Sequence, residues 1–241
     1  MKLIITKDYD EMSLEAAKLI AEQVSSNKES ILGLATGSTP LGTYNELIRR
    51  NKEENLDFSK VKSFNLDEYI GLPPDNDQSY FYFMYNNLFK HINIKPDAYK
   101  VPSGISEYID AYCLTYDKSI EDAGGVDLQL LGLGNNGHIA FNEPASFFAD
   151  KTNTVALTES TIEANARFFE NKDLVPKKAI TMGIGTIMRA RKIVLIASGK
   201  SKAQAVKALF EGPIAPDMPA SALRFHQDCV IIVDKDAASL L

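Results

Sequence analysis

The sequence predicts an α/β fold in which a mostly parallel sheet carries helices on both faces. Strand-like and helix-like segments alternate along all 241 residues, the order expected of parallel strands joined by helical crossovers. The strand-like residues 31–35, 126–131 and 193–197 are largely apolar without alternation, as in strands buried on both faces. No linker or internal repeat interrupts the pattern. We therefore expect one α/β domain over residues 1–241.

Short β-type or apolar runs bounded by turn residues predict the strands. These runs are residues 3–6, 31–35, 61–66, 126–131, 154–157, 179–182, 193–197 and 230–233. Apolar residues at helical spacing predict the helices. The helices are expected at residues 10–24, 40–50, 79–89, 106–122, 160–169 and 201–210, with a short one from residue 186. Residues from about 150 to 180 make a long excursion between strands, and we expect a mobile flap there.

The composition is that of an ordinary globular protein, with 45% hydrophobic and 24% charged residues. The net charge of 26 − 32 = −6 argues against a nucleic-acid partner and against a polybasic membrane anchor. Cys113 and Cys229 lack metal-ligand spacing, which favours a reducing compartment. The apolar residues 3–5 are too few for a signal peptide, and no run is long enough to span a membrane. We expect a cytoplasmic protein.

The apolar run at residues 126–131 breaks into glycines and amides that hold His138 and, five residues later, Glu143. A turn directly after a parallel strand is where open α/β sheets bind their ligands. An imidazole suits proton transfer near neutral pH. A histidine that only bonds to the backbone is the alternative. No other histidine or cysteine lies close in sequence, so we expect no metal site.

A second candidate site follows residues 31–35, where the chain continues as Thr-Gly-Ser-Thr-Pro-Leu-Gly from Thr36. Gly37 lets backbone amides approach an anion, and Ser38 or Thr39 can cap the helix that follows. The free amides and the helix dipole then favour a bound anion. The pattern matches neither nucleotide-binding glycine motif, so a sugar phosphate is expected. A capped helix without a ligand is the alternative.

Two basic residues are candidates to complete this anion site. Arg167 lies in the predicted flap, and Lys202 lies after residues 193–197 at the start of a helix. A lysine at a helix N-terminus opposes the helix dipole, which a shared anion would explain. A solvated surface lysine is the alternative.

Asp67 directly follows residues 61–66 and is therefore expected at the same sheet edge as the other candidates. A carboxylate in that place can abstract a proton from a carbon next to a carbonyl or imine. A turn or cap aspartate is the alternative. Because polar side chains follow three strand ends, we favour the catalytic interpretation.

Along nearly its whole length the chain resembles the glucosamine-6-phosphate deaminase (isomerase) family. The resemblance is carried by residues 36–40, 64–72, 79–80, 132–144, 165–169 and 199–202. Its most specific part is Gly-His-Ile-Ala-Phe-Asn-Glu-Pro at residues 137–144. The resemblance implies a modified Rossmann-type fold and a role in amino sugar catabolism. The implied enzyme, of the hydrolase class, converts glucosamine 6-phosphate and water to fructose 6-phosphate and ammonia without a metal or organic cofactor.

By this resemblance His138 is the acid/base that opens the pyranose ring, and Glu143 orients and polarises it. Asp67 takes the proton from C2 and returns it at C1 through an enolamine. Asn136 is a further catalytic-site residue, although many members carry aspartate there, so Glu143 must supply the charge. The implied substrate-binding residues are Thr36, Gly37, Ser38, Thr39, Tyr80, Arg167 and Lys202.

Allosteric hexameric members of the family carry a basic pair shortly after the Glu-Pro dipeptide. The matching positions here are Asn153 and Val155, and only residues 234–241 follow the last predicted strand. We therefore expect a monomer that N-acetylglucosamine 6-phosphate does not activate.

Two other functions are compatible with part of the sequence. A 6-phosphogluconolactonase shares the phosphate loop and the Gly-His turn, but lacks the matches at residues 65–69 and 141–144. The sugar-phosphate-sensing domain of a transcriptional regulator is attached to a DNA-reading helix pair, and the first strand here already starts at residue 3.

Overall fold

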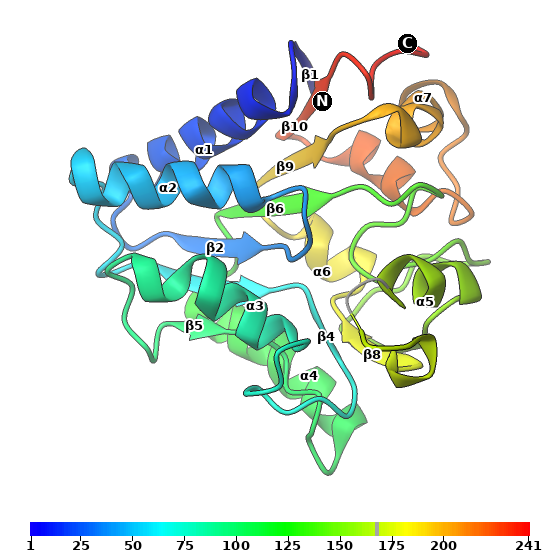
Figure 1. The fold of residues 1–241 in the computed structure, drawn as a ribbon, viewed down its shortest axis with the longest axis horizontal. Coiled ribbons are helices and arrows are strands. Elements are labelled where there is room, and N and C mark those ends of the chain that lie inside the picture. The colour runs from blue at the N-terminus through cyan, green and yellow to red at the C-terminus, as the bar shows by residue number, and fades with distance from the viewer. Residues whose placement is uncertain (167–168) are drawn as a thin grey trace.

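A seven-stranded sheet forms the centre of the protein (Figure 1), for which a computed structural model describes residues 1–166 and 169–241. The strand order is β1-β10-β9-β6-β2-β3-β5, and every neighbouring pair is parallel. The strands are β1 (Lys2–Thr6), β2 (Ile31–Leu34), β3 (Lys62–Asn65), β5 (Tyr99–Lys100), β6 (Leu128–Gly132), β9 (Lys192–Ala197) and β10 (Cys229–Asp234). The predicted α/β fold with a mostly parallel sheet is confirmed.

Helices cover both faces of this sheet, as predicted. One face carries α1 (Tyr9–Ser26), α2 (Leu41–Glu53) and α3 (Tyr80–Asn87), whereas the other carries α4 (Ile109–Ala123), α6 (Ile184–Met188) and α7 (Ala203–Glu211). Successive strand side chains point to opposite faces. Along β9, Val194 and Ile196 therefore join the core under α1 and α2, while Ile193 and Leu195 join the core under α4 and α7.

A second, antiparallel sheet has the order β4-β8-β7, with β4 (Asp67–Tyr69), β8 (Lys178–Thr181) and β7 (Asn153–Ala156). Residues 154–157 and 179–182 were expected as strands of the main sheet, and that prediction is wrong. The residues of β7 are half-buried or exposed, because this strand is not covered on both faces. Helix α5 (Glu159–Asn165) packs on the small sheet through Ile162 and lies beside β8 in Figure 1.

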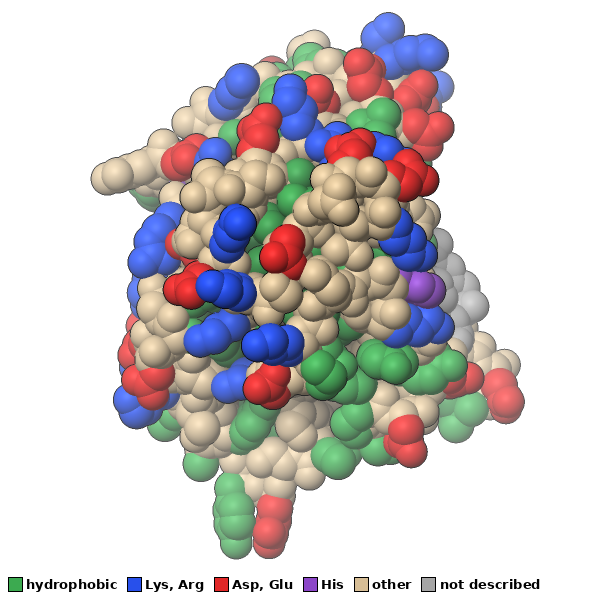
Figure 2. All heavy atoms as spheres, turned by 90° about the vertical axis from the view of Figure 1, so that its left-hand side faces the viewer, with side chains coloured by type: hydrophobic (Ala, Val, Ile, Leu, Met, Phe, Trp, Pro, Cys, Tyr) green, Lys and Arg blue, Asp and Glu red, His purple; other side chains and the backbone are tan. Residues whose placement is uncertain are grey.

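Charges of both signs are intermixed on the surface that Figure 2 shows, which is the left-hand side of Figure 1. A helix long and apolar enough to cross a membrane is absent from the described residues.

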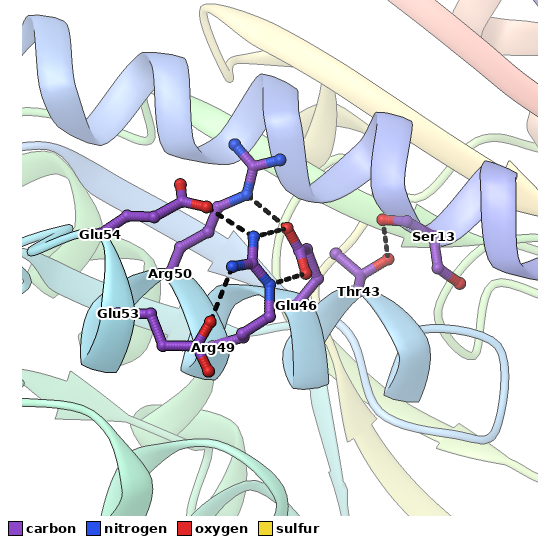
Figure 3. Close-up of polar contacts among 7 residues, drawn as sticks. All are labelled: Ser13, Thr43, Glu46, Arg49, Arg50, Glu53 and Glu54. Atoms are coloured by element: carbon purple, nitrogen blue, oxygen red, sulfur yellow. Dashed lines mark hydrogen bonds and ion pairs between the residues drawn. The ribbon is translucent and has the colours of Figure 1, made fainter.

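The outer side of α2 carries the charge cluster drawn in Figure 3. Glu46, which is 9% exposed, accepts hydrogen bonds from Arg49 at 2.8 Å and from Arg50 at 2.7 Å. Arg49 also contacts Glu53 at 3.0 Å and Glu54 at 2.6 Å. The hydrogen bond from Arg49, with help from Arg50 and against the effect of burial, lowers the pKa of Glu46 to about 2.

Replacing Glu46 by Gln is expected to lower the free energy of unfolding at pH 7 by about 1 kcal/mol, because charge-assisted contacts with two partly exposed arginines are lost. The lowered pKa means that the contribution is complete above the ordinary value of 4.5 and shrinks as the pH falls toward about 2. Urea unfolding of wild type and Glu46→Gln at several pH values measures this difference in the free energy of unfolding. Glu53→Gln, which loses one exposed contact, serves as the control, and equal losses in the two variants would contradict the prediction.

Candidate active site

A cavity of about 610 Å³ lies where the carboxyl ends of β2, β3, β6 and β9 meet at one edge of the main sheet. β2 and β6 are neighbours there, although the chain leaves them toward opposite edges of the sheet, an arrangement that typically holds a ligand. The sequence-predicted residues that line the cavity are Thr36, Gly37, Ser38, Thr39, Asp67, Tyr80, Asn136, His138 and Lys202. Glu143 lies behind His138, and Arg167 lies outside the described residues.

The loop after β2 reaches the cavity as expected, but its capping differs from the prediction. Gly37 has a positive φ of 104°, a conformation that side chains disfavour. Pro40 is the N-cap of α2, and no described side chain caps the helix in the way predicted for Ser38 or Thr39. Instead the Tyr9 hydroxyl accepts from Gly42 N at 2.8 Å and donates to the Ser38 carbonyl at 3.2 Å. The loop is therefore held from α1.

Lys202 enters the cavity from a 3₁₀ turn, Lys200–Lys202, directly after β9. Gly199 opens this turn with a φ of 90°. The carboxylate of Asp234, at the end of β10, accepts from Gly199 N at 3.0 and 3.1 Å and from the Ser198 hydroxyl. Asp234 thus anchors the turn that presents Lys202, a role that sequence reasoning missed.

Asp67 and Glu68 are consecutive residues of β4, so their side chains point in opposite directions. Asp67 lines the cavity and is 6% exposed. Burial, together with the charge of Glu68, raises the pKa of Asp67 to about 8. Glu68 points toward α3 and accepts from the amides of Tyr69, Tyr80 and Phe81 at 2.8–3.0 Å. Burial raises the pKa of Glu68 to about 7, although these three hydrogen bonds oppose the shift.

His138 sits in the turn after β6, above the backbone of Gly134. Its Nδ1 lies 3.4 Å from Glu143 Oε2, and this buried nitrogen makes no hydrogen bond to the part of the chain that is described. Asn136 joins the two segments, because its Nδ2 donates to Glu143 Oε2 at 2.7 Å and its Oδ1 accepts from His138 N at 3.2 Å. A Cβ on Gly134 would lie 2.4 Å from the imidazole ring, so only glycine leaves room for the ring.

Glu143 is half-buried but strongly held in its ionised form. Burial alone would raise its pKa, yet the contacts with His138, the Thr161 hydroxyl and Asn136 outweigh burial and lower the pKa to about 2. Thr161 donates to Oε1 of the carboxylate, and the Thr158 hydroxyl lies 3.4 Å from the same oxygen. A fixed negative charge therefore stands next to the imidazole at neutral pH.

Aromatic rings form one wall of the cavity. Tyr80 stacks on Phe141 with ring centroids 6.0 Å apart, and Tyr69 lies 4.8 Å from Tyr80. Phe169 contacts Tyr69 at 5.9 Å and also lines the cavity. Of these rings only Tyr80 was predicted as a site residue. An apolar wall beside charged groups lowers the local polarity, which strengthens electrostatic interactions inside the site.

The site residues missed by sequence reasoning are polar side chains that act through other residues. Thr161, Glu68 and Asp234 each bond to a segment distant in sequence. Single threonines and acids are common in helix caps and turns, so the sequence holds no signal that separates these from the rest. Among the described residues, no group of three or more His, Cys, Asp or Glu is arranged to hold a metal ion.

Comparison with known proteins places the chain in a family. Residues 7–232 match the glucosamine-6-phosphate isomerases/6-phosphogluconolactonases. A glucosamine-6-phosphate deaminase of Clostridium perfringens is 58% identical over 241 residues, which is the whole of both chains. A solved structure of a monomeric glucosamine-6-phosphate deaminase is 46% identical, with a TM-score of 0.98 and full coverage of both chains. The 6-phosphogluconolactonase from Trypanosoma cruzi has a TM-score of 0.77 and 22% identity, covering 100% of this chain and 96% of that one, which concerns the fold alone.

Replacing Gly134 by Ala is expected to displace the His138 ring, because the added methyl group would overlap it. Such overpacking should also lower the free energy of unfolding by about 1–3 kcal/mol. Gly132→Ala is the matched control, since a Cβ there meets nothing within 4 Å. Crystal structures and urea unfolding of both variants measure the two effects. An unmoved imidazole in Gly134→Ala would show that the steric argument is wrong.

Proposed function

The chain belongs to the family of glucosamine-6-phosphate isomerases and 6-phosphogluconolactonases, and we propose that within it the chain is a glucosamine-6-phosphate deaminase. The reaction converts glucosamine 6-phosphate and water to fructose 6-phosphate and ammonia. The observation that carries the proposal is that one cavity joins a buried carboxyl of raised pKa, Asp67, to a histidine backed by an ionised Glu143. The 58% identity to the Clostridium perfringens deaminase supports it.

The phosphate group is proposed to bind at the loop Gly37, Ser38 and Thr39, with Lys202 as the cationic partner. All four line the cavity, and its volume of about 610 Å³ falls in the range usual for small-molecule sites. Arg167 is proposed as a further phosphate ligand on the resemblance alone. A bound phosphate places C1 and C2 of the sugar near the acid and base groups. The loss of translational and rotational entropy is then met on binding and not in the chemical step.

Ring opening is assigned to His138. Its imidazole takes the proton of the C1 hydroxyl and returns it to the ring oxygen, which leaves an open-chain aldehyde. The negative charge of Glu143, 3.4 Å from Nδ1, stabilises the imidazolium formed in between. Asn136 carries no charge and contributes by holding Glu143 through its amide.

Proton transfer at carbon is assigned to Asp67. Its carboxylate removes the proton from C2 while the C1 oxygen takes a proton from solvent, which gives an enolamine. Asp67 then returns its proton at C1 to leave an iminium at C2. Water then adds to this iminium and ammonia leaves, and this hydrolysis gives back the solvent proton. A pKa of about 8 for Asp67 suits a base that works near neutral pH. In the empty site this carboxyl is mostly protonated at pH 7, so the active fraction increases as the pH rises.

We also propose a cytoplasmic monomer that lacks the effector site of allosteric members. The similar monomeric deaminase supports the monomer. Asn153 donates to the Lys151 carbonyl and Val155 packs on the core of the small sheet, so neither supplies the basic group that an effector phosphate needs. Cys113 and Cys229 are free thiols, as in proteins of reducing compartments.

Incubation of the purified protein with glucosamine 6-phosphate is expected to release ammonia and fructose 6-phosphate in equal amounts, also after treatment with a chelator. The initial rate should depend hyperbolically on substrate and should not respond to N-acetylglucosamine 6-phosphate. Hydrolysis of 6-phosphogluconolactone without ammonia release would instead identify a lactonase. A sigmoidal rate curve that the N-acetylated ligand makes hyperbolic would refute the absence of an effector site.

Asp67→Asn is expected to lower the exchange of the C2 proton with solvent by about 10²- to 10⁴-fold, the usual contribution of a general base. Binding of the sugar phosphate should change little, because the phosphate contacts come from other segments. Deuterium incorporation followed by NMR and equilibrium binding measure the two effects. Asp75→Asn, in an exposed turn, is the control. Near-normal turnover in Asp67→Asn would mean that the base is a different residue.

A further inference from the structure

The two carboxylate oxygens of Glu143 face different parts of the fold. Oε2 accepts from Asn136 at 2.7 Å and lies 3.4 Å from His138 Nδ1. Oε1 accepts from the hydroxyl of Thr161 and lies 3.4 Å from the hydroxyl of Thr158; these residues belong to α5 and its N-cap. One side chain therefore connects the catalytic turn to the helix that covers the small sheet.

The direction of these hydrogen bonds follows from counting protons. A carboxylate only accepts, so the single hydroxyl proton of Thr161 points to Glu143. Thr158 Oγ1 accepts from Thr161 N at 3.3 Å and lies 3.0 Å from Thr161 Oγ1, to which it can donate. Each hydroxyl in such a chain polarises the next one. Thr161, which is 7% exposed, is the member that touches the carboxylate most closely.

The orientation of this carboxylate matters because its contact with the imidazole is incomplete. Nδ1 of His138 is buried without a hydrogen-bond partner among the described residues. A rotation of the Glu143 carboxylate about its own axis would move Oε2 either toward Nδ1 or away from it. The Thr161 hydroxyl restrains that rotation from the opposite oxygen.

We propose that Thr161 is a positioning residue for ring opening: it fixes the Glu143 carboxylate so that Oε2 faces His138. The inference rests on the deaminase function proposed above. It assigns no contact between Thr161 and the reacting atoms, and Asp67 acts independently of it. A purely structural threonine in α5 would instead affect both chemical steps alike.

Thr161→Val, which keeps the shape and removes the hydroxyl, is expected to lower kcat for glucosamine 6-phosphate by about 10- to 100-fold, the effect of one hydrogen bond to a charged group. An analogue of glucosamine 6-phosphate that lacks the C4 and C5 hydroxyls cannot close a sugar ring and therefore needs no ring opening. Its kcat in Thr161→Val should differ from that of wild type by less than about 2-fold, because its conversion depends on proton transfer by Asp67 and not on His138. Thr161→Ser should retain most of the activity. Thr154→Val, on β7, is the matched control. Equal losses on both substrates, or no loss on either, would overturn the proposal.

A second measurement does not depend on which reaction the protein catalyses. Titration of the Glu143 carboxyl by ¹³C NMR in the unliganded protein should show a higher pKa in Thr161→Val than in wild type or Thr154→Val, because a hydrogen bond to the ionised form is lost. An unchanged pKa would overturn the positioning role. If wild type releases no ammonia but the pKa rises in Thr161→Val, the proposed function fails and the positioning of Glu143 stands.

Discussion

Parallel pairing among β9, β6, β2 and β3 is the constraint on which the cavity depends. In this register Leu128 of β6 pairs with Leu32 of β2 on one side and with Lys192 of β9 on the other. The carboxyl ends of these neighbouring strands therefore lie at the same edge of the sheet. The carboxyl ends of these strands then bring the loop at Gly37, Asp67, the His138 turn and Lys202 together around one cavity. Helices on both faces make the pairing possible, because they remove the apolar strand side chains from water.

Much of this arrangement could be predicted because its signals are local. Apolar runs such as residues 193–197 and glycine-rich breaks after them mark strand ends in the sequence itself. The second sheet could not be predicted in the same way, because β4 has three residues and pairs with β8, far along the chain. The cap of α2 was mispredicted for a similar reason, since the hydroxyl that supports it comes from Tyr9, in another helix. Whether Arg167 reaches the phosphate stays a prediction.

The second sheet also explains how neighbouring residues acquire different tasks. In β4, alternation turns Asp67 toward the cavity and Glu68 toward the first turn of α3. There Glu68 accepts hydrogen bonds from the amides of Tyr80 and Phe81, which hold Tyr80 against the cavity. The same sheet carries α5, whose Thr161 reaches Glu143. The small sheet β4-β8-β7 therefore positions Asp67, Tyr80 and, through α5, the threonine that contacts Glu143.

The buried pair Asp67 and Glu68 also couples folding of the protein to the uptake of protons. Both carboxyls hold their protons in the folded state up to pKa values of about 8 and about 7, whereas their ordinary values are 3.8 and 4.5. Unfolding near pH 6 therefore releases protons into the solvent. By linkage this part of the folded state is most favourable below about pH 4 and loses its advantage as the pH rises toward about 8. The alkaline conditions that ionise Asp67 are thus the conditions that destabilise the fold around it.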